Sequence, residues 1–183
     1  MAPSQLGVFA KSDPSLDEPN LQYHIQPLSL DAFGEPLHTF SAITASVCNL
    51  QPDSRGTVTI RSPNADDNPV IKPNYLSTPS DKNIAAKSIT LTRNIFATEA
   101  MRKYEPTEFL PGAEHQSPEA LAEQAGNIST SIFHPVGTAK MGTGKDAVVD
   151  RELNVYGIQN LRVVDASIMP KITSGNTNSP TLM

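Results

Sequence analysis

The sequence predicts an α+β fold with an antiparallel-rich sheet and flanking helices, because strand-like and helix-like segments are segregated along the chain. Strand-favouring runs come before residue 75, and helical patterns follow between residues 81 and 126. The chain also has 16 prolines in 183 residues, which divide it into short elements. No strand–helix alternation, the pattern of a parallel doubly wound sheet, occurs over this part of the sequence.

Three runs predict the strands. Residues 21–30 and 38–50 are rich in strand-favouring side chains and are separated by the turn-prone sequence DAFGEP. Residues 56–62 alternate apolar and polar side chains, with Val58 and Ile60 on one face. This alternation predicts a strand that is buried on one face and exposed on the other.

Two helices are predicted after a proline-rich stretch, residues 62–80, which itself predicts a loop and a short edge strand. Apolar residues recur at roughly helical spacing over residues 81–104. Ser117, followed by a proline and a glutamate, predicts the N-cap of the second helix, and Gly126 predicts its end.

Composition excludes several classes of function. Fourteen basic against 19 acidic residues give a formal net charge of −5, and the absence of a basic cluster argues against a nucleic-acid surface. No apolar run of about 18 residues predicts a membrane span, and no signal peptide is visible, so a cytoplasmic location is expected. The single cysteine, Cys48, allows no internal disulfide. The four histidines are far apart, without HxxxH or CxxC spacing, so no metal site is expected.

The character of the chain changes beyond Gly126. Residues 128–134 are extended and apolar, and residues 148–167 predict two short strands around a central turn. The second of these strands, residues 161–164, is apolar apart from one arginine, as in a strand that a parallel sheet covers on both faces. No other part of the chain supplies parallel neighbours for it.

His134 is the first candidate for chemistry. It precedes Pro135 and the turn formed by Gly137 and Thr138, so its imidazole is held on a rigid segment. Histidine is also the only unperturbed side chain that takes up a proton near neutral pH. A lone histidine is more often a structural residue, and the residues alone leave this alternative open. For His24, in an alternating strand, a structural role is favoured over contact with a substrate.

The second candidate is a turn near the carboxyl end of the sequence. Asn176, Thr177 and Asn178 follow a glycine, and Ser179 predicts the cap of a final helix that opens with a proline. This turn is either a structural loop before a well-capped helix, or a set of amide and backbone N–H groups presented to a polar or anionic ligand.

Together, these segments resemble the carboxyl-terminal portion of the glucose–methanol–choline family of FAD-dependent oxidoreductases. The motifs that carry the resemblance are FHPVGTAKMG, VVDRELNVYGIQNLRVVDASIMP and SGNTNSPT. Upstream, LQYHIQPLSL, SRGTVTI, PNYLSTPSD and EFLPG are similar to the bacterial choline-dehydrogenase and alcohol-dehydrogenase branch. The resemblance implies a substrate-binding domain over residues 1–133. It also implies a catalytic segment over residues 134–183, which adds the last strand and the start of the last helix to a Rossmann-like FAD-binding domain.

The resemblance further implies that a primary alcohol (choline-like, aliphatic or aryl) is oxidised to the aldehyde by hydride transfer to N5 of FAD. His134 matches the family's catalytic base. Asn176 matches the second catalytic position, where an amide can hydrogen-bond the substrate oxygen but cannot accept its proton. The residues implied to contact FAD are Asp165, Ala166, Asn176, Thr177, Asn178, Pro180 and Thr181.

The sequence also departs from the family. It has no GxGxxG motif of the kind that binds the FAD pyrophosphate, and it stops where relatives continue their final helix. The chain is therefore expected to be a fragment whose partner is a missing amino-terminal FAD-binding segment. The alternative is a non-catalytic fragment or remnant that cannot bind FAD alone. Without parallel neighbours, residues 161–164 are expected to favour self-association.

Overall fold

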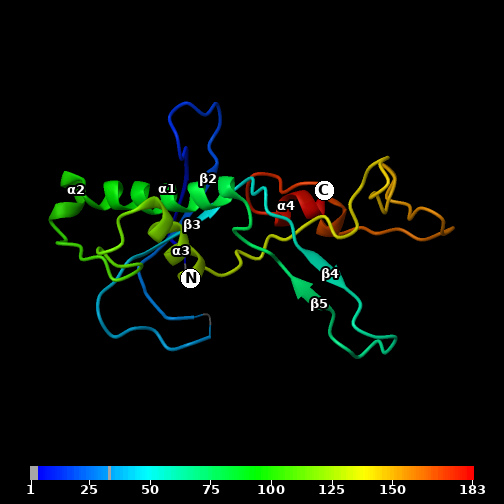
Figure 1. The fold of residues 1–183 in the computed structure, drawn as a ribbon, viewed down its shortest axis with the longest axis horizontal. Coiled ribbons are helices and arrows are strands. Elements are labelled where there is room, and N and C mark those ends of the chain that lie inside the picture. The colour runs from blue at the N-terminus through cyan, green and yellow to red at the C-terminus, as the bar shows by residue number, and fades with distance from the viewer. Residues whose placement is uncertain (1–3, 33) are drawn as a thin grey trace. The chain divides into compact units, whose positions relative to one another are not determined.

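The structure, a computed structural model, describes residues 4–32 and 34–183, and its short strands and helices form two compact units (Figure 1). Unit 1 comprises Met1–Asn49 with Thr78–Ser129, and unit 2 comprises Leu50–Ser77 with Thr130–Met183. Each unit is therefore assembled from two separate stretches of the chain. The predicted domains, 1–133 and 134–183, are defined by function and stay a prediction.

Unit 1 contains a three-stranded antiparallel sheet with the order β1-β2-β3. The strands are β1 (Leu6–Ala10), β2 (Leu21–Gln26) and β3 (Thr44–Asn49). The strands predicted over residues 21–30 and 38–50 are confirmed, although both are shorter than predicted. β1 was not predicted, because four of its five residues are exposed and it has no buried face.

Helix α1 (Pro79–Phe96) packs on one face of this sheet (Figure 1). Tyr23 of β2 is buried there, and its hydroxyl donates to the carbonyl of Ser88 at 3.3 Å and lies 3.1 Å from the hydroxyl of Thr92. Since successive side chains of a strand point to opposite faces, His24 lies on the face of the sheet away from α1.

The helix predicted over residues 81–104 is two helices in the structure. The side chain of Thr78 caps α1 by accepting a hydrogen bond from the backbone N–H of Asp81, so the helix begins before the predicted start. It ends at Phe96, and a short α2 (Glu99–Arg102) follows. The periodicity of apolar residues continued through this break, and for that reason the sequence did not predict it.

Helix α3 (Pro118–Ile128) confirms the second predicted helix. Ser117 caps it as predicted, accepting from the backbone N–H of Ala120, and the helix continues past Gly126 to Ile128. Small and branched side chains of α1 and α3 pack together as a core cluster, whose buried residues are Ala86, Ile89, Leu121 and Ala125.

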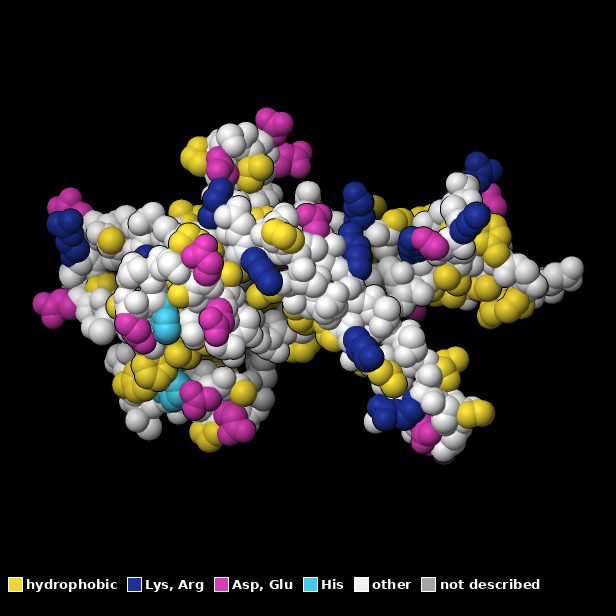
Figure 2. All heavy atoms as spheres, viewed as in Figure 1, with side chains coloured by type: hydrophobic (Ala, Val, Ile, Leu, Met, Phe, Trp, Pro, Cys, Tyr) yellow, Lys and Arg dark blue, Asp and Glu magenta, His cyan; other side chains and the backbone are white. Residues whose placement is uncertain are grey.

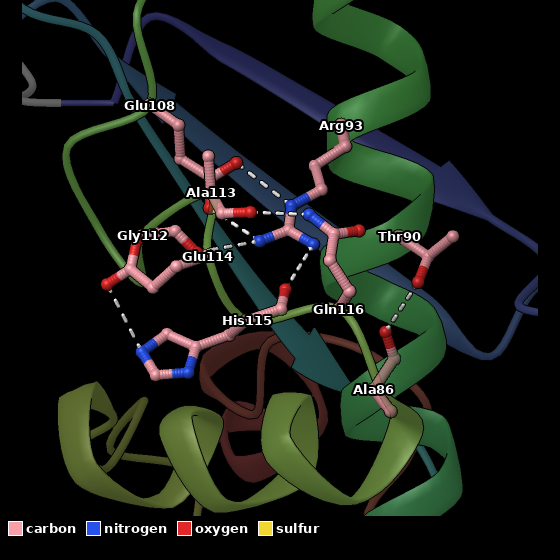
Figure 3. A network of polar contacts seen from close by, with 9 residues as sticks. All are labelled: Ala86, Thr90, Arg93, Glu108, Gly112, Ala113, Glu114, His115 and Gln116. Carbon is pink, nitrogen blue, oxygen red and sulfur yellow. Dashed lines mark hydrogen bonds and ion pairs between the residues drawn. The ribbon is translucent and has the colours of Figure 1, made fainter.

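Arg93 of α1 joins that helix to the loop that precedes α3 (Figure 3). Its Nε and Nη2 atoms donate to the two carboxylate oxygens of Glu108 at 2.9 and 2.8 Å. Nη1 donates to the carbonyl of His115 at 2.8 Å, and Nη2 also donates to that of Gly112 at 3.0 Å. The carboxylate raises the pKa of the Arg93 guanidinium further above its ordinary value. One side chain thus fixes a long loop at three points.

Unit 2 contains an antiparallel hairpin of β4 (Thr57–Thr59) and β5 (Val70–Lys72). β5 is the predicted short edge strand. The prediction that β4 is buried on one face is wrong for this chain, because Val58 is 48% exposed and Ile60 is 89% exposed. The described residues form only two strands here and leave the apolar side chains of the hairpin exposed. Figure 2 shows hydrophobic side chains at the surface in this region, among basic and acidic ones.

The remainder of unit 2 is largely irregular. Instead of the two strands predicted over residues 148–167, the structure has isolated bridges, including an antiparallel bridge between Asn154 and Arg162. The segment 161–164 has no parallel neighbour in the described residues, and Val164 is 68% exposed. A single 3-10 turn (Ala166–Ile168) and the short helix α4 (Asn178–Leu182) complete the unit.

Candidate active site

The segment that carries His134, residues 131–141, is irregular and belongs to unit 2. Phe133, immediately before it, has a φ of 63°, an uncommon left-handed conformation for a bulky residue, and its N–H donates to the hydroxyl of Ser131 at 3.0 Å. Gly137 has a φ of 89°, and a Cβ built on it would lie 3.3 Å from the carbonyl oxygen of Met169. The imidazole of His134, which is half-buried, is therefore carried by backbone that is constrained on both sides.

Two backbone hydrogen bonds fasten this segment to the 3-10 turn at residues 166–168. The N–H of Ala139 donates to the carbonyl of Ser167 at 3.0 Å, and the N–H of Met141 donates to that of Ile168 at 2.8 Å. The structure thus brings the chain that follows His134 together with the predicted cofactor residues Asp165, which is the N-cap of the turn, and Ala166, which is its first residue.

Asp165 has a structural task that the sequence did not predict. Its carboxylate caps the 3-10 turn by accepting hydrogen bonds from the backbone N–H of Ser167, at 2.8 Å, and from the hydroxyl of the same residue. The hydroxyl first, and then the N–H, hold the pKa of the Asp165 carboxyl below its ordinary value. One oxygen of this carboxylate is therefore already engaged by the protein itself.

The Asp165 carboxylate is expected to be protonated, and its capping bonds lost, only at a pH below the ordinary pKa of an aspartate. Because the folded-state pKa of Asp165 is depressed from 3.8, the cap stabilises the fold above the unfolded-state pKa and is lost as the pH falls through the lower folded-state value. The amide shift of Ser167, followed by NMR from about pH 6 to about pH 2, should titrate with a midpoint below that of a free aspartate. The Asp165→Asn variant should remove this titration, and a midpoint at the free value would contradict the assignment.

The turn near the carboxyl end is fixed on both sides of Asn176. Before it, Ser174 has a φ of 56°, and the side-chain amide of Gln51 donates to the Ser174 hydroxyl at 2.8 Å. After it, Thr177 is buried, and its carbonyl accepts hydrogen bonds from the N–H and the hydroxyl of Thr181 at 3.0 and 2.6 Å. The turn is thus a defined structure, although Asn176 itself is exposed.

The start of the final helix differs from the prediction. The cap is Thr177 and not Ser179, and α4 begins at Asn178. Thr177 has the helical angles φ −88° and ψ −8° and makes no side-chain capping bond, because its backbone already follows the helix. The helix has five residues, so its N-terminal dipole is that of little more than one turn.

The predicted site residues all lie in unit 2 but differ in exposure. Asp165, Asn176 and Asn178 are exposed, and Thr177 is buried. The half-buried members are His134, Ala166, Pro180 and Thr181. His24, which belongs to unit 1, has an Nε2 atom that is buried without a hydrogen-bond partner among the described residues. Its role stays a prediction.

A glycine pair near this site does not form a phosphate-binding turn. Gly142 and Gly144 lie in the sequence GTGKDA, but this segment is an irregular loop and not a strand-to-helix turn.

Among residues 4–32 and 34–183, no three His, Cys, Asp or Glu side chains are grouped as metal ligands would be. Nor does any helix in that part of the chain have the length and apolar character needed to cross a bilayer.

Comparison with known proteins identifies the family. Residues 52–183 match the family described as GMC oxidoreductase. The chain belongs to the GMC oxidoreductase family. This confirms the resemblance that the motifs indicated, and GMC oxidoreductases are FAD-dependent flavoproteins.

The curated relatives of this GMC chain are enzymes about three times as long. It is 41% identical over 180 residues to an alcohol dehydrogenase [acceptor] of Pseudomonas putida, covering 98% of this chain and 33% of the relative. It is 40% identical over 181 residues to the mitochondrial choline dehydrogenase of Homo sapiens, covering 98% of this chain and 30% of the relative.

Solved structures of GMC proteins share the fold. Pyridoxine 4-oxidase from Mesorbium loti superposes with a TM-score of 0.89 at 28% identity, over 98% of this chain and 36% of that protein. An FAD-dependent oxidoreductase from Chaetomium thermophilum has a TM-score of 0.74 at 32% identity, over 90% of this chain and 26% of that protein. The mixed fold with an antiparallel sheet is therefore confirmed, whereas no Rossmann-like sheet is present in the described residues.

Proposed function

We propose that this chain is the carboxyl-terminal catalytic part of an FAD-dependent enzyme that oxidises a primary alcohol to the aldehyde. The carrying observation is the pair of backbone hydrogen bonds that hold the His134 segment against residues 166–168. They join Ala139 and Met141, five and seven positions after the proposed base, to the proposed cofactor-binding segment. The relatives named as an alcohol dehydrogenase and as choline dehydrogenases support the substrate class.

The residues present fit a flavin. The side chains of Asn176 and Asn178 are exposed and carry amide groups that can donate hydrogen bonds. Because one carboxylate oxygen of Asp165 is engaged by Ser167, we assign the cofactor contact there to the backbone of Asp165 and Ala166. Bound FAD would supply the chemistry of hydride acceptance from the alcohol carbon. Thr177, Pro180 and Thr181 complete the proposed contact set.

His134 is the proposed base. A ring nitrogen of the neutral imidazole accepts the hydroxyl proton of the alcohol as the substrate loses a hydride from its carbon. The constrained backbone on both sides of His134 holds the ring in one place, which is what proton transfer over a short distance requires. The amide N–H groups of Asn176 donate to the substrate oxygen and orient it, because an amide has no basic nitrogen.

We further propose that a flavin-binding segment supplies the parallel neighbours of residues 161–164. The chain spans about a third of the length of its curated relatives, which leaves room for such a segment. The exposure of Val164 and the lack of parallel neighbours in the described residues support this assignment. Without the segment, the same edge would promote self-association.

A fusion enzyme tests the proposal. The matched third of the Pseudomonas putida relative would be replaced by this chain, and alcohol-dependent reduction of a dye would be measured. We expect activity with at least one primary alcohol from a choline-like, aliphatic and aryl panel. The chain alone should show no stoichiometric flavin absorbance. A fusion that binds FAD but oxidises none of these alcohols would favour the alternative, a non-catalytic fragment.

A further inference from the structure

The side chain of Gln51 lies against the turn that carries Asn176, although 123 positions separate Gln51 from its partner Ser174. Its Nε2 donates to the Ser174 hydroxyl at 2.8 Å. Leu50, the residue before it, is buried and fixes the backbone from which the amide extends. Both partners belong to unit 2, so this hydrogen bond is internal to one compact unit.

The segment that presents Gln51 is itself held firmly. The side-chain amide of Asn74 donates to the carbonyl of Arg55 at 2.9 Å, and the N–H of Ser77 donates to the hydroxyl of Ser54 at the same distance. At Gly56 a Cβ would clash with the backbone oxygens of Lys72 and Pro73, so the two backbones are in close contact. Gln51 therefore extends from a backbone segment whose residues 54–55 are hydrogen-bonded to Asn74 and Ser77, after the hairpin.

The hydrogen bond from Gln51 is made to Ser174, the residue with a left-handed backbone that comes shortly before Asn176. Ser174 has a φ of 56°, a conformation that non-glycine residues adopt only where the surroundings enforce it. Gly175 follows and has no Cβ to restrict the backbone. On the other side, the buried Thr177 and α4 fix the chain by local contacts. Asn176 is thus held from one side by its neighbours in sequence and from the other by a side chain from residue 51.

We propose that Gln51 is a positioning residue for Asn176: it fixes the left-handed turn at Ser174 and so sets where the Asn176 amide meets the substrate oxygen. This inference rests on the proposed function. Loss of one neutral hydrogen bond corresponds to about a fivefold change in rate if the bond's whole contribution acts on the transition state. In this proposal Gln51 acts through Ser174 and not on the reacting atoms.

A double-mutant cycle in the fusion enzyme tests the proposal. Gln51→Met and Ser174→Ala should each lower kcat about fivefold and change KM less than twofold. The double variant should be no slower than Gln51→Met, because that variant already lacks the bond that Ser174→Ala breaks. Gln51→Arg, which restores a donor of similar reach, should recover most of the rate. Asn20→Leu is the matched control, because Asn20 makes an amide-to-serine bond of 2.8 Å to Ser12 in unit 1. It should leave kcat unchanged.

A second readout does not depend on activity. In the chain itself, NMR order parameters of the Gly175 and Asn176 amides should fall in Gln51→Met and recover in Gln51→Arg. Additive losses in the cycle, or an unchanged kcat with unchanged order parameters, would overturn the proposal. Asn176→Ala separates the two hypotheses: if it leaves the rate unchanged, the proposed role of the turn fails, whereas a large effect of Asn176→Ala beside a silent Gln51→Met rejects only the role of Gln51.

Discussion

Replacing His134 by alanine in the fusion enzyme is expected to lower kcat/KM for the alcohol roughly 10²- to 10⁴-fold, the usual contribution of a general base. The reason is the loss of the ring nitrogen that accepts the hydroxyl proton, while the backbone bonds that fasten the segment to residues 166–168 do not involve the imidazole. The measurement is the initial rate of dye reduction at several alcohol concentrations, with bound FAD quantified by its absorbance in every variant.

Two comparisons make this result specific to proton transfer. His134→Gln keeps a polar side chain of similar size and should be as inactive as His134→Ala, since an amide cannot accept the proton. Added imidazole should restore part of the rate to His134→Ala alone. A control variant, His115→Gln, alters a histidine of unit 1 and should retain activity. If His134→Ala keeps more than about a tenth of the rate while FAD stays bound, the assignment of the base is wrong.

The second large effect is expected on stability. Arg93→Met should lower the free energy of unfolding by roughly 2–4 kcal/mol, because it leaves the half-buried Glu108 carboxylate and two loop carbonyls without their charged donor. The side chains of Arg93 and Glu108 are each 22% exposed, so water only partly replaces the lost bonds. Urea unfolding followed by circular dichroism measures the change.

A matched pair on the same helix provides the control. Lys87 of α1 donates to Asp13 at 2.8 Å, but these side chains are 38% and 42% exposed. Lys87→Met should therefore cost much less than Arg93→Met, because solvent screens the pair. The double variant Arg93→Met with Glu108→Leu should be more stable than Arg93→Met alone, since it removes the unpaired carboxylate. Equal effects of Lys87→Met and Arg93→Met would show that the two-point contact of Arg93 with Glu108 contributes no more to the free energy of unfolding than the exposed pair does.

The sequence predicted those parts of the fold that local patterns determine. Ser117 caps α3 as predicted, because capping depends on neighbouring residues. β1 was missed since a short exposed strand is recognisable only through its pairing with β2. The alternation at Val58 and Ile60 predicted the strand but also a covering layer that the described residues do not provide. Local pattern thus specified the strand, while burial depends on what packs against it.

The motifs predicted the residues of the candidate site, but they did not predict the hydrogen bonds that hold these residues in place. His134 and Asn176 were found because the motifs around them are contiguous in sequence. The capping role of the Asp165 carboxylate was missed because the motif suggested a cofactor contact, whereas the geometry shows a hydrogen bond two residues away. Gln51 carries no motif that connects it with Ser174, and only the folded chain brings them together. Long-range pairings of this kind leave no periodicity to detect.

The interleaving of the two units sets an order on their assembly during synthesis. Residues 50–77 leave the ribosome before their partners, residues 130–183, so the first stretch of unit 2 is synthesised before unit 1 is completed at Ser129. At ordinary translation speeds the interval from residue 129 to residue 183 is about 3 to 10 seconds. During that time Gln51 lacks its partner Ser174, and the segment with His134 is synthesised only after unit 1 can fold.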